Sequence, residues 1–343
     1  MKIKDIAKLA GVSKSSVSLA LNGKPGISEE TRMKIVNIAK QYGYSPRPYF
    51  KSEDIETSLK IIRFVACTNE GIVTDTFQYQ PFFMELISYI EQIVSSKGYS
   101  LILSSISPNN LSQQLSRLEQ QQKSSGILLL GTNISAEQIN ALAKQYNNLI
   151  ILDSYFESIN SNFINMNNIL GARQAGEFLV KLGHKKIGYV KSNIRMLNFD
   201  LRKKAFFEVL EENSIFIDNK YVYSMSPTNI GINQEFKNNI LKQKDDLPTA
   251  LFCECDYMAI SVIKTLNTLQ IKVPDDISII GFDNIKEADI INPELTTVHV
   301  KKKEIAQYAV EKLINIIENK DEDKIKLLID TEIVERKSCK RIK

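Results

Sequence analysis

A short polar segment near the N-terminus, residues 13–21, has side chains suited to hydrogen bonding with a nucleic acid. It reads Ser-Lys-Ser-Ser-Val-Ser-Leu-Ala-Leu. In a helix begun by Ser13, the apolar Val17 and Ala20 share one face, while the serines and Lys14 occupy the other. Hydroxyl and ammonium groups donate to phosphate oxygens and base edges, and a lysine reaches O6 and N7 of guanine. We therefore expect this helix to contact DNA.

Two further helical segments flank this one. The first has apolar residues at spacings of three and four, namely Ile3, Ile6, Ala7 and Ala10. The third, which Ser28 can cap, continues such a face through Met33, Val36 and Ala39. Three short helices with a tight turn after the first form a helix-turn-helix unit, which lays its second helix in the DNA major groove. We predict DNA contacts from Lys4, Ser13, Lys14, Ser15, Ser16, Ser18, Asn22, Lys24, Ser28 and Arg47.

The distribution of charge agrees with binding to DNA. Residues 1–51 contain ten Lys and Arg and three Asp and Glu, a net charge of +7, whereas the whole chain carries +4. The remaining 292 residues are therefore mildly acidic, at −3. A basic head on an acidic body concentrates cations where a phosphate backbone would pass. A plain helical bundle with a solvated basic face would show the same charges, so charge alone leaves that alternative open.

Length and composition exclude several classes of protein. A chain of 343 residues has room for two or three domains, and its 43% hydrophobic and 24% charged residues are typical of globular proteins. No apolar run approaches the ~20 residues of a membrane span, and Lys2 and Lys4 precede no apolar signal segment. We expect a cytoplasmic, nucleoid-associated protein whose four cysteines are reduced. Cys253-Glu254-Cys255 lacks the spacing of a zinc site and there are two histidines, so we expect no metal and no cofactor.

After residue 60, strand and helix patterns alternate along the chain. Strands are predicted at 61–67, 99–104, 126–130, 149–152, 163–165, 186–190, 221–223, 249–253, 277–281, 296–300, 326–329 and 331–335. Helices are predicted at 82–97, 112–123, 135–146, 169–182, 197–213, 231–241, 257–269 and 303–318. Such alternation makes doubly wound parallel sheets with helices on both faces, and ligands bind beyond the carboxyl ends of the strands. We predict a head at 1–46, a hinge or linker at 47–60, and a two-lobed core at 61–343.

The two lobes would share the C-terminal part of the chain. We assign 61–162 and part of 285–325 to the first lobe, and 163–284 with 326–343 to the second. A cleft between the lobes is the expected ligand site.

The N-terminal segment resembles the DNA-binding domain of the LacI/GalR family of bacterial transcription regulators. The matching elements are Asp5-Ile6-Ala7, Ala10-Gly11-Val12-Ser13, Ser16-Val17-Ser18, Leu21-Asn22, Val36 and Gly43-Tyr44-x-Pro46. The core resembles the effector-binding core of the same family, which has the type I periplasmic-binding-protein fold. Its matching phrases include Gly98-Tyr99, Leu182-Gly183-His184-Lys185-Lys186, Val273-Pro274-x-Asp276, Gly281-Phe282-Asp283-Asn284 and Pro293-x-Leu295-Thr296-Thr297.

The resemblance implies an effector site at aligned positions. Asp283 stands where the family's aspartate binds ligand hydroxyls, and Arg202 resembles the family's pocket arginine. Phe82 and Phe83 could supply an aromatic platform, and Asp153 and Asp256 are weaker candidates. Each residue also has a structural alternative: a helix cap or ion pair for Asp283, a surface position for Arg202, the core for the phenylalanines, and an unspecified structural role for Asp153 and Asp256.

Two positions depart from the family pattern. The family commonly has Arg where this chain has Leu19, so the operator can differ. In the family the linker folds into a hinge helix and a leucine wedges into the minor groove. Here Glu53 occupies the wedge position, where phosphates would repel it. Tyr49 or Phe50 could act as the wedge instead, and a plain linker is the alternative.

The sequence lacks the motifs of the main competing class, an enzyme that binds a dinucleotide. There is no Gly-x-Gly-x-x-Gly, and the stretch from Gly126 to Gly131 is filled by apolar residues. We expect a homodimeric, non-enzymatic repressor that binds a double-stranded operator and responds to a sugar or sugar phosphate. A nucleobase or a partner protein as co-effector is the alternative. A sugar-binding or enzymatic α/β protein without DNA binding is much less favoured.

Overall fold

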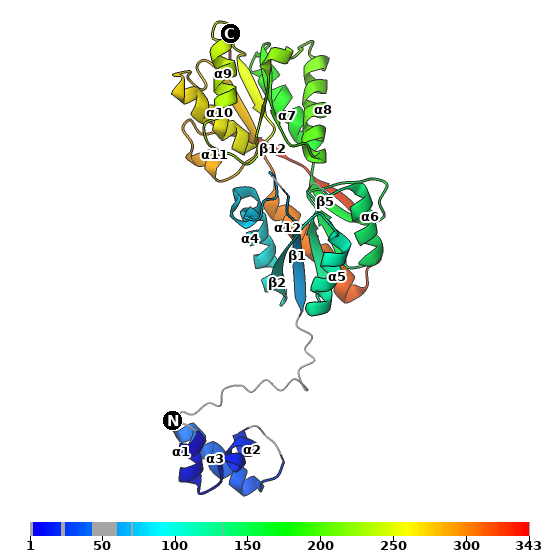
Figure 1. Cartoon of the computed structure of the whole chain (residues 1–343), viewed down its shortest axis with the longest axis vertical. Coiled ribbons are helices and arrows are strands. Elements are labelled where there is room, and N and C mark those ends of the chain that lie inside the picture. The colour runs from blue at the N-terminus through cyan, green and yellow to red at the C-terminus, as the bar shows by residue number, and fades with distance from the viewer. Residues whose placement is uncertain (1–2, 22–24, 43–59, 70, 133, 343) are drawn as a thin grey trace. The chain divides into compact units, whose positions relative to one another are not determined.

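The computed structural model describes residues 3–21, 25–42, 60–69, 71–132 and 134–342. The chain divides into two compact units, residues 1–58 and 59–343 (Figure 1). The predicted contacts Asn22, Lys24 and Arg47, and the predicted hinge up to residue 59, lie outside the described residues. No described helix is long and apolar enough to cross a membrane.

The first unit contains three helices, α1 (Ile3–Ala10), α2 (Lys14–Leu21) and α3 (Glu29–Gln41). They enclose a small core of seven buried side chains: Ile6, Ala7, Ala10, Val17, Ala20, Ile35 and Ala39. The prediction that Met33 belongs to the buried face of α3 is wrong, since 60% of Met33 is exposed. Ile35 and Ala39, one turn apart, form that face instead, and Met33 lies away from it.

Three side chains, those of Ser13, Ser28 and Arg32, hold the ends of these helices through four hydrogen bonds. The Ser13 hydroxyl accepts from the Ser16 amide at 3.1 Å, and the Ser28 hydroxyl accepts from the Thr31 amide at 3.3 Å. These are the predicted N-caps of α2 and α3. At the other end of α2, Arg32 Nη1 donates to the carbonyls of Leu19 and Ala20, both at 3.3 Å. Arg32 therefore satisfies the last carbonyls of α2, which have no partner within the helix.

The second unit holds two six-stranded sheets. The first contains β1 (Ile61–Cys67), β2 (Ser100–Ile106), β3 (Gly126–Leu130), β4 (Leu149–Leu152), β5 (Asn162–Met166) and β11 (Lys326–Ile329), in the order β11-β5-β4-β3-β1-β2. All of its strand pairs are parallel. One face is covered by α4 (Pro81–Ser96) and α12 (Lys302–Asn319), the other by α5 (Leu111–Gln121) and α6 (Ala136–Gln145). A 3-10 turn, η1 (Phe77–Tyr79), precedes α4.

The second sheet contains β6 (Ile187–Ser192), β7 (Val222–Met225), β8 (Ala250–Cys253), β9 (Ser278–Asp283), β10 (Thr296–His299) and β12 (Glu332–Val334). Its order is β12-β10-β9-β8-β6-β7, and β12 alone in it is antiparallel to its neighbour. Helices α7 (Asn168–Lys181) and α8 (Leu197–Glu212) pack together on one face, with α9 (Gln234–Lys242) and α10 (Asp256–Thr268) on the other (Figure 1). The short elements η2 (Asn219–Tyr221) and α11 (Glu287–Ile290) complete this lobe.

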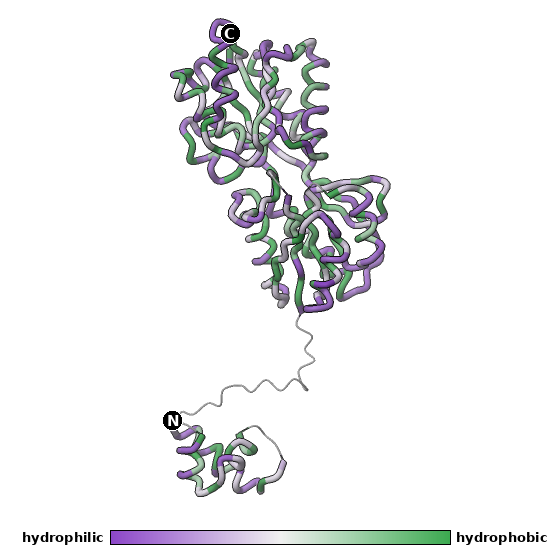
Figure 2. The backbone as a smooth tube through the Cα atoms, viewed as in Figure 1, coloured by the Kyte–Doolittle hydropathy of each residue, from purple (hydrophilic) through white to green (hydrophobic). Residues whose placement is uncertain are grey.

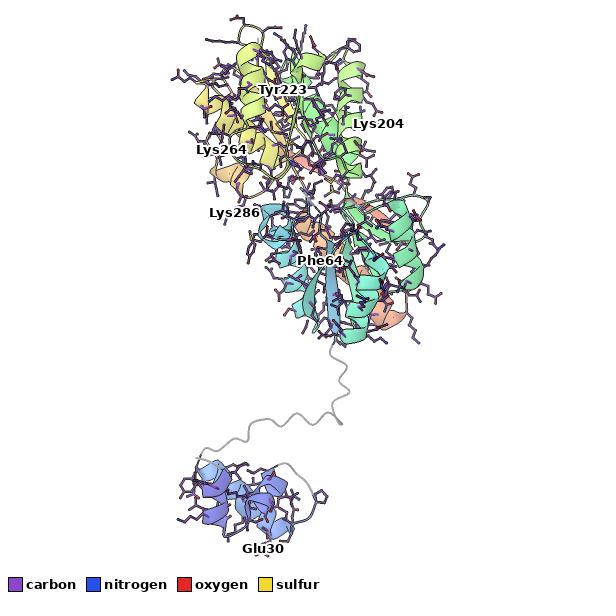
Figure 3. All side chains as sticks on the ribbon, in the orientation of Figure 1. Glu30, Phe64, Lys204, Tyr223, Lys264 and Lys286 are labelled. Atoms are coloured by element: carbon purple, nitrogen blue, oxygen red, sulfur yellow. The ribbon has the colours of Figure 1, made fainter. Side chains whose placement is uncertain are left out.

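The central strands are buried on both faces, which is why they read as continuous apolar runs. All residues of β1, β3, β4, β8 and β9 are buried, and the hydrophobic segments lie inside each lobe (Figure 2). Phe64 and Tyr223 lie within the two sheets at 0% and 2% exposure, whereas Lys204 lies on the outer face of α8 (Figure 3).

The predicted lobe boundaries need correction. Strands β5 and β11 belong to the first sheet, although residues from 163 and from 326 were assigned to the second lobe. The stretch 285–325, of which we assigned only a part to the first lobe, divides between the lobes: β10 belongs to the second sheet, while α12 packs on the first. The chain therefore passes between the lobes three times: after β5, between β10 and α12, and between β11 and β12. Strand patterns reveal that a strand exists, but parallel pairing with a distant segment decides which sheet receives it.

Candidate functional site

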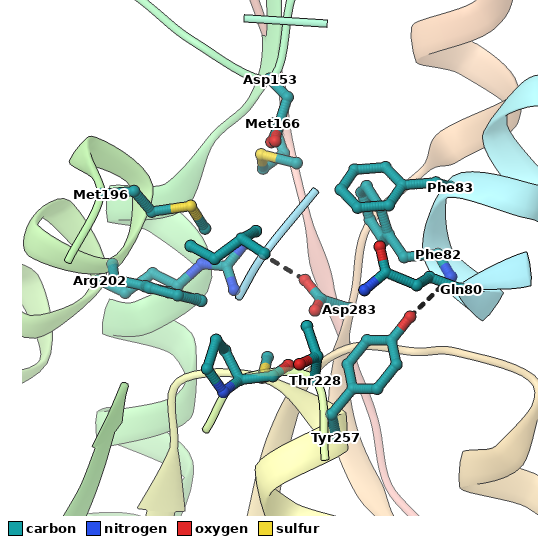
Figure 4. A pocket seen from close by; sticks show the side chains of 14 residues that line it. Gln80, Phe82, Phe83, Asp153, Met166, Met196, Arg202, Thr228, Tyr257 and Asp283 are labelled. Atoms are coloured by element: carbon teal, nitrogen blue, oxygen red, sulfur yellow. Dashed lines mark hydrogen bonds and ion pairs between the residues drawn. The ribbon is translucent and has the colours of Figure 1, made fainter. Parts of the chain in front are cut away.

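A pocket lies between the two lobes (Figure 4), and the space inside it, counted together with the open solvent at its mouth, is about 460 Å³. Its walls come from the carboxyl ends of strands in both sheets and from the segments that follow them. They consist of Ile72, Gln80, Phe82, Phe83, Asp153, Met166, Met196, Phe199, Arg202, Pro227, Thr228, Cys255, Tyr257 and Asp283. The structure thus brings together five of the six predicted effector residues, Phe82, Phe83, Asp153, Arg202 and Asp283.

Arg202 and Asp283 form a buried ion pair in the wall of the pocket. Arg202 Nη2 lies 3.2 Å from Asp283 Oδ1, and the side chains are 3% and 10% exposed. The guanidinium also donates through Nε to Asn168 Oδ1 at 2.8 Å and through Nη1 to the carbonyl of Glu254 at 2.6 Å. It lies 3.6 Å from the centre of the Phe282 ring. All three guanidinium nitrogens therefore have protein partners, and the surface alternative for Arg202 is wrong.

The backbone at Asp283 adopts a conformation that few residues other than glycine accept. Its φ is 114°, and that of the following Asn284 is 51°. Such conformations cost on the order of 1–3 kcal/mol each and persist when surrounding contacts over-determine them. Here Arg336 Nη2 donates to Asn284 Oδ1 at 2.8 Å, and the Asn284 side-chain nitrogen lies 2.9 Å from His299 Nδ1. The strained backbone therefore belongs to the residue whose carboxylate lines the pocket, Asp283, and to the residue after it.

Asp153 lies at the end of β4 and has partners on both oxygens. Thr132 Oγ1 donates to Oδ2, and Asn198 Nδ2 donates to Oδ1 at 2.7 Å. Burial of the carboxylate raises the pKa of Asp153 to about 6, although the bonds from Thr132 and Asn198 oppose the shift. Asn198 lies in the first turn of α8, in the second lobe, so Asp153 connects the two lobes as well as lining the pocket.

Asp256 does not line the pocket, in contrast to the prediction. It is fully buried at the start of α10, where Oδ1 accepts from Thr297 Oγ1 at 2.5 Å and Oδ2 accepts from the Ile285 amide at 2.9 Å. Burial, and the neighbouring charge of Asp283, raise the pKa of Asp256 to about 8. A Cβ at Gly281 would lie 2.2 Å from Asp256 Oδ1, so glycine is needed for this close packing. Asp256 therefore fastens β10 and the loop after β9.

The aromatic part of the wall also joins the two lobes. Phe82 and Phe83, at the start of α4, meet edge to face with ring centres 5.4 Å apart. They are 7% and 6% exposed, so they belong to the core as well as to the pocket. The Phe82 amide donates to the hydroxyl of Tyr257, on α10, at 3.1 Å. This bond is a direct link between α4 of the first lobe and α10 of the second.

Several pocket residues were not among the predicted ones: Ile72, Gln80, Met166, Met196, Phe199, Pro227, Thr228, Cys255 and Tyr257. Met166 ends β5, and Pro227 and Cys255 each follow a strand within two residues. The rule that ligands bind beyond the carboxyl ends of parallel strands could have found these three. Met196 and Phe199, in contrast, reach the pocket through the packing of α8, which no local pattern indicates.

The pocket offers few free hydrogen-bonding groups. The donors of Arg202 and the oxygens of Asp153 already have protein partners, as described above. Gln80 Oε1 is buried without a hydrogen-bond partner. The hydroxyl of Thr228 makes one long contact, 3.3 Å, with that of Ser226. Among the described residues, the remaining capacity is thus the Gln80 amide, the Thr228 hydroxyl and the lone pairs of Asp283 not used by Arg202. The hydroxyl proton of Tyr257 adds one donor, since the oxygen of that group accepts from the Phe82 amide.

On the first unit, the predicted contact residues that the structure describes lie at or near the surface. Lys4, Ser13, Lys14, Ser15 and Ser28 are exposed, whereas Ser16 and Ser18 are half-buried. The Ser13 hydroxyl lies 2.6 Å from that of Ser15 and 2.9 Å from that of Ser16. The N-terminal end of α2 therefore presents a cluster of hydroxyls and, at Lys14, an exposed lysine. These groups are suited to contacts with phosphates and base edges.

The described residues include no cluster of His, Cys, Asp and Glu that could hold a metal ion. The four cysteines are free thiols. His184 lies 2.9 Å from Thr249 Oγ1 and 3.1 Å from the Lys340 carbonyl, so it connects secondary-structure elements of the second lobe.

Comparisons with known proteins agree with this arrangement. Residues 2–47 match the family profile described as "Bacterial regulatory proteins, lacI family", and residues 177–339 match "Periplasmic binding protein-like domain". The chain is 31% identical to the HTH-type transcriptional repressor PurR of Mannheimia succiniciproducens, over 99% of each chain. It is 32% identical to that of Photorhabdus laumondii, over 98% of this chain and 96% of the relative.

Solved structures of similar fold include two complexes with small molecules. The lac repressor dimer bound to operator and the anti-inducer ONPF matches with a TM-score of 0.72 and 21% identity, over 99% of each chain. The transcriptional regulator CelR in complex with cellobiose matches with a TM-score of 0.69 and 20% identity, over 98% of this chain and 99% of that one. At these identities the likeness concerns the fold.

Proposed function

Since the chain belongs to the LacI family of bacterial regulatory proteins and is a DNA-binding transcriptional repressor rather than an enzyme, we propose that a nucleobase bound between its lobes controls its affinity for the operator. Repressors of this family bind operator DNA and small-molecule effectors and act as dimers. The proposal concerns the chemical class of the effector and the residues that bind it. It replaces a sugar, our expectation from the sequence, as the favoured effector.

The observation that carries the proposal is the shortage of free polar groups in the pocket. A sugar brings a hydroxyl on nearly every carbon, and each one left unbonded in a buried site costs about 1–3 kcal/mol. The wall, however, consists mainly of Phe, Met, Ile, Pro and Tyr side chains. Its polar residues Arg202 and Asp153 are already paired, which leaves few partners for five or more hydroxyls.

A flat nitrogen heterocycle matches these walls better. Its two faces need apolar or aromatic neighbours, which Phe82, Phe199 and Met196 can supply, since sulfur and aromatic edges both pack well on rings. Its edge carries N–H donors for which Asp283 and Gln80 provide acceptors. The Asp283 carboxylate, which pairs with Arg202 through one oxygen, and the unpartnered Gln80 Oε1 can each accept one such N–H donor. The name of the relatives, transcriptional repressor PurR, agrees with a purine.

For DNA, we propose that α2 enters the major groove and that Lys14, Ser15 and Ser18 contact base edges or phosphates. Lys4 and Ser28 would contact the backbone. A dimer would place two such heads on a pseudo-palindromic operator, because a two-fold symmetric protein fits two inverted half-sites. A repressor acts on the chromosome, so we place the protein in the cytoplasm.

A thermal-shift screen of the full chain tests the effector class. The compounds are guanine, hypoxanthine, adenine and xanthine on one side, and ribose, glucose 6-phosphate and cellobiose on the other. A ligand at about 100 times its Kd adds about 2.7 kcal/mol to the free energy of unfolding, which should raise the Tm by several degrees. We expect a rise with at least one base. A rise with a sugar and none with any base would overturn the proposed class.

The variant Gln80→Leu then tests the assigned edge contact. We expect it to weaken base binding about 10-fold, measured by isothermal titration calorimetry, because one hydrogen bond is lost. Tyr79→Leu, at an exposed neighbouring position (74% exposed), is the matched control and should bind as the wild type does.

A further inference from the structure

Helix α12 runs from the pocket toward the beginning of β1. It has 18 residues and so spans about 27 Å. It packs on α4 and on the first sheet, and a Cβ at Gly126 in β3 would lie 2.7 Å from Leu313 of the helix. Such close packing makes the helix and the sheet move together. Each end of α12 carries a charged contact with another element.

At the pocket end lies Lys302, a lysine whose side chain is 1% exposed. Its Nζ donates to the carbonyl of Asp283 at 3.0 Å and to that of Asn284 at 3.3 Å. It also lies 3.2 Å from Oε2 of Glu85, on α4. The two carbonyls belong to the strained residues that end β9, so this ammonium holds the loop that presents the pocket carboxylate.

The hydrogen bonds from Lys302 differ from the other contacts that hold the Asp283–Asn284 loop, because they cross the boundary between the lobes. Arg336 and His299, which hold the Asn284 side chain, belong to the second lobe, as does the loop itself. Lys302 and Glu85 belong to the first lobe. A ligand seated on the Asp283 carboxylate therefore acts on the residue whose carbonyl is bonded across the lobe boundary. Any shift of that carbonyl reaches α12 directly.

At the far end of α12, Glu318 contacts the start of the first sheet. Its Oε1 accepts from Lys60 Nζ at 2.9 Å and from the Tyr99 hydroxyl at 3.2 Å. Tyr99 is 4% exposed, and the amide of its neighbour Ser100 donates to the Lys60 carbonyl at 2.8 Å. Lys60 directly follows, in the sequence, the segment that connects the core to the helix-turn-helix unit.

We propose that Lys302 is a positioning residue that passes the state of the effector pocket through α12 to the start of β1, and from there to the DNA-binding head. Lys302 binds neither effector nor DNA; it acts through the Asp283–Asn284 loop at one end and through Glu318 at the other. This proposal depends on the proposed function in one respect: it assumes that an effector binds in the pocket. Its mechanical part holds for the ligand-free protein.

Hydrogen–deuterium exchange of the ligand-free full chain tests that mechanical part. Lys302→Met keeps most of the volume and removes the ammonium. We expect exchange to rise at least about fivefold in residues 281–287, which lose a direct restraint. We expect a similar rise in residues 60–67, because α12 is then held less firmly at its pocket end. Lys301→Met is the matched control, because Lys301 is adjacent and pairs with Glu332 at 3.6 Å but does not contact the loop. It should leave residues 60–67 unchanged.

Two results would overturn the proposal. One is a rise confined to the pocket loop in Lys302→Met; the other is an equal rise at residues 60–67 in Lys301→Met. Should Lys302→Met fail to fold, Glu85→Gln decides the matter, since Glu85 is 33% exposed and glutamine keeps its shape while it removes the charge that faces Lys302. We then expect a smaller increase, about twofold, in both segments. No change in either segment would count against the proposal.

A second measurement separates this proposal from the effector class. Binding of a duplex from the promoter of the protein's own gene is followed by fluorescence anisotropy with and without guanine. If guanine changes the wild-type Kd about 10-fold, Lys302→Met should reduce that change to less than about twofold, and an undiminished change would refute the role of Lys302. If guanine has no effect on the wild type, the measurement is repeated with hypoxanthine, adenine and xanthine. If none of the four bases has an effect, the nucleobase assignment fails, and the exchange result alone decides the role of Lys302.

Discussion

The ion pair between Arg202 and Asp283 allows a quantitative test by a double-mutant cycle. The perturbations are Arg202→Met, Asp283→Asn and the combination. At 3.2 Å, with an effective dielectric constant of about 20, two unit charges attract by about 5 kcal/mol, part of which offsets their desolvation. Removing one partner from a buried pair typically costs about 3–5 kcal/mol, because the other charge stays uncompensated.

The surrounding contacts refine these values. In Asp283→Asn, the guanidinium keeps its bonds to Asn168 and Glu254 and its stacking on Phe282, so we expect a loss of about 2–3 kcal/mol. In Arg202→Met, those partners lose their donor and Asp283 loses its counter-charge, so we expect about 3–5 kcal/mol. The bonds to Asn168 and Glu254 are lost in both Arg202→Met and the double variant and cancel in the cycle. The interaction energy should be about 2 kcal/mol.

Urea unfolding of the full chain, followed by far-UV circular dichroism at pH 7 and pH 5, measures these values. Burial already raises the pKa of Asp283, and removal of Arg202 raises it further. A group with a raised folded-state pKa loses its stabilising contribution as the pH rises through that value, so Arg202→Met should be more harmful at pH 7 than at pH 5. Arg173→Met with Glu212→Gln, a more exposed pair (31% and 55%), is the control cycle and should show an interaction energy below about 1 kcal/mol. Additivity within about 0.5 kcal/mol for Arg202 and Asp283 would refute the reasoning.

Three further predictions concern the lobe contacts and the head. Asp153→Asn should gain stability relative to the wild type as the pH rises from 4 to 7, by up to about 3 kcal/mol. The reason is that the wild-type carboxylate, with its pKa of about 6, must then ionise in a buried site. Unfolding curves at several pH values check this, and parallel pH profiles of stability for both proteins would contradict it. Tyr257→Phe leaves the Phe82 amide without its acceptor and should cost about 1–3 kcal/mol, measured by urea unfolding, with Tyr308→Phe (47% exposed) as a neutral control. Lys14→Ala should weaken binding to the promoter duplex and lower the slope of log K against log salt concentration by about one, whereas Lys144→Ala on the core should leave the slope unchanged; an unaltered slope in Lys14→Ala would exclude a phosphate contact.

The helices of the head could be predicted almost to the residue, because the signals that define them are local. Ser13 and Ser28 precede α2 and α3, whose first amides have no partner within the helix. In the structure the hydroxyl of each serine accepts a hydrogen bond from one of these amides. The role of Arg32 was not predictable, since it reaches back to carbonyls 12 and 13 residues earlier. The error at Met33 shows the limit of periodicity: several apolar residues on a short helix allow more than one choice of buried face.

In the pocket, too, residues whose position depends on local sequence could be predicted, whereas those whose position depends on distant contacts could not. Asp283 ends a strand and was predicted through that position and through the resemblance. Asp256 and Tyr257 are neighbours on α10, yet Tyr257 faces the pocket and Asp256 faces Thr297 on β10. Successive helix residues differ by about 100° in direction, so an error of one residue places a side chain on another face. The assignment of β5 and β11 was wrong for a related reason, since it depends on pairing between residues about 160 positions apart.

The three crossings between the lobes also have a consequence for how the protein is made. The first lobe begins at β1, yet its edge strand β11 and its covering helix α12 come from the last 42 residues of the chain, after the sheet of the second lobe is almost complete. During synthesis, one edge of β5 therefore stays unpaired, and the face of the first sheet on which α4 packs still lacks α12. Exposed edges and apolar faces of this kind favour aggregation. A chain that ends before residue 302 would lack both α12 and β11, so its first sheet would keep an open edge beside β5 and an incompletely covered face.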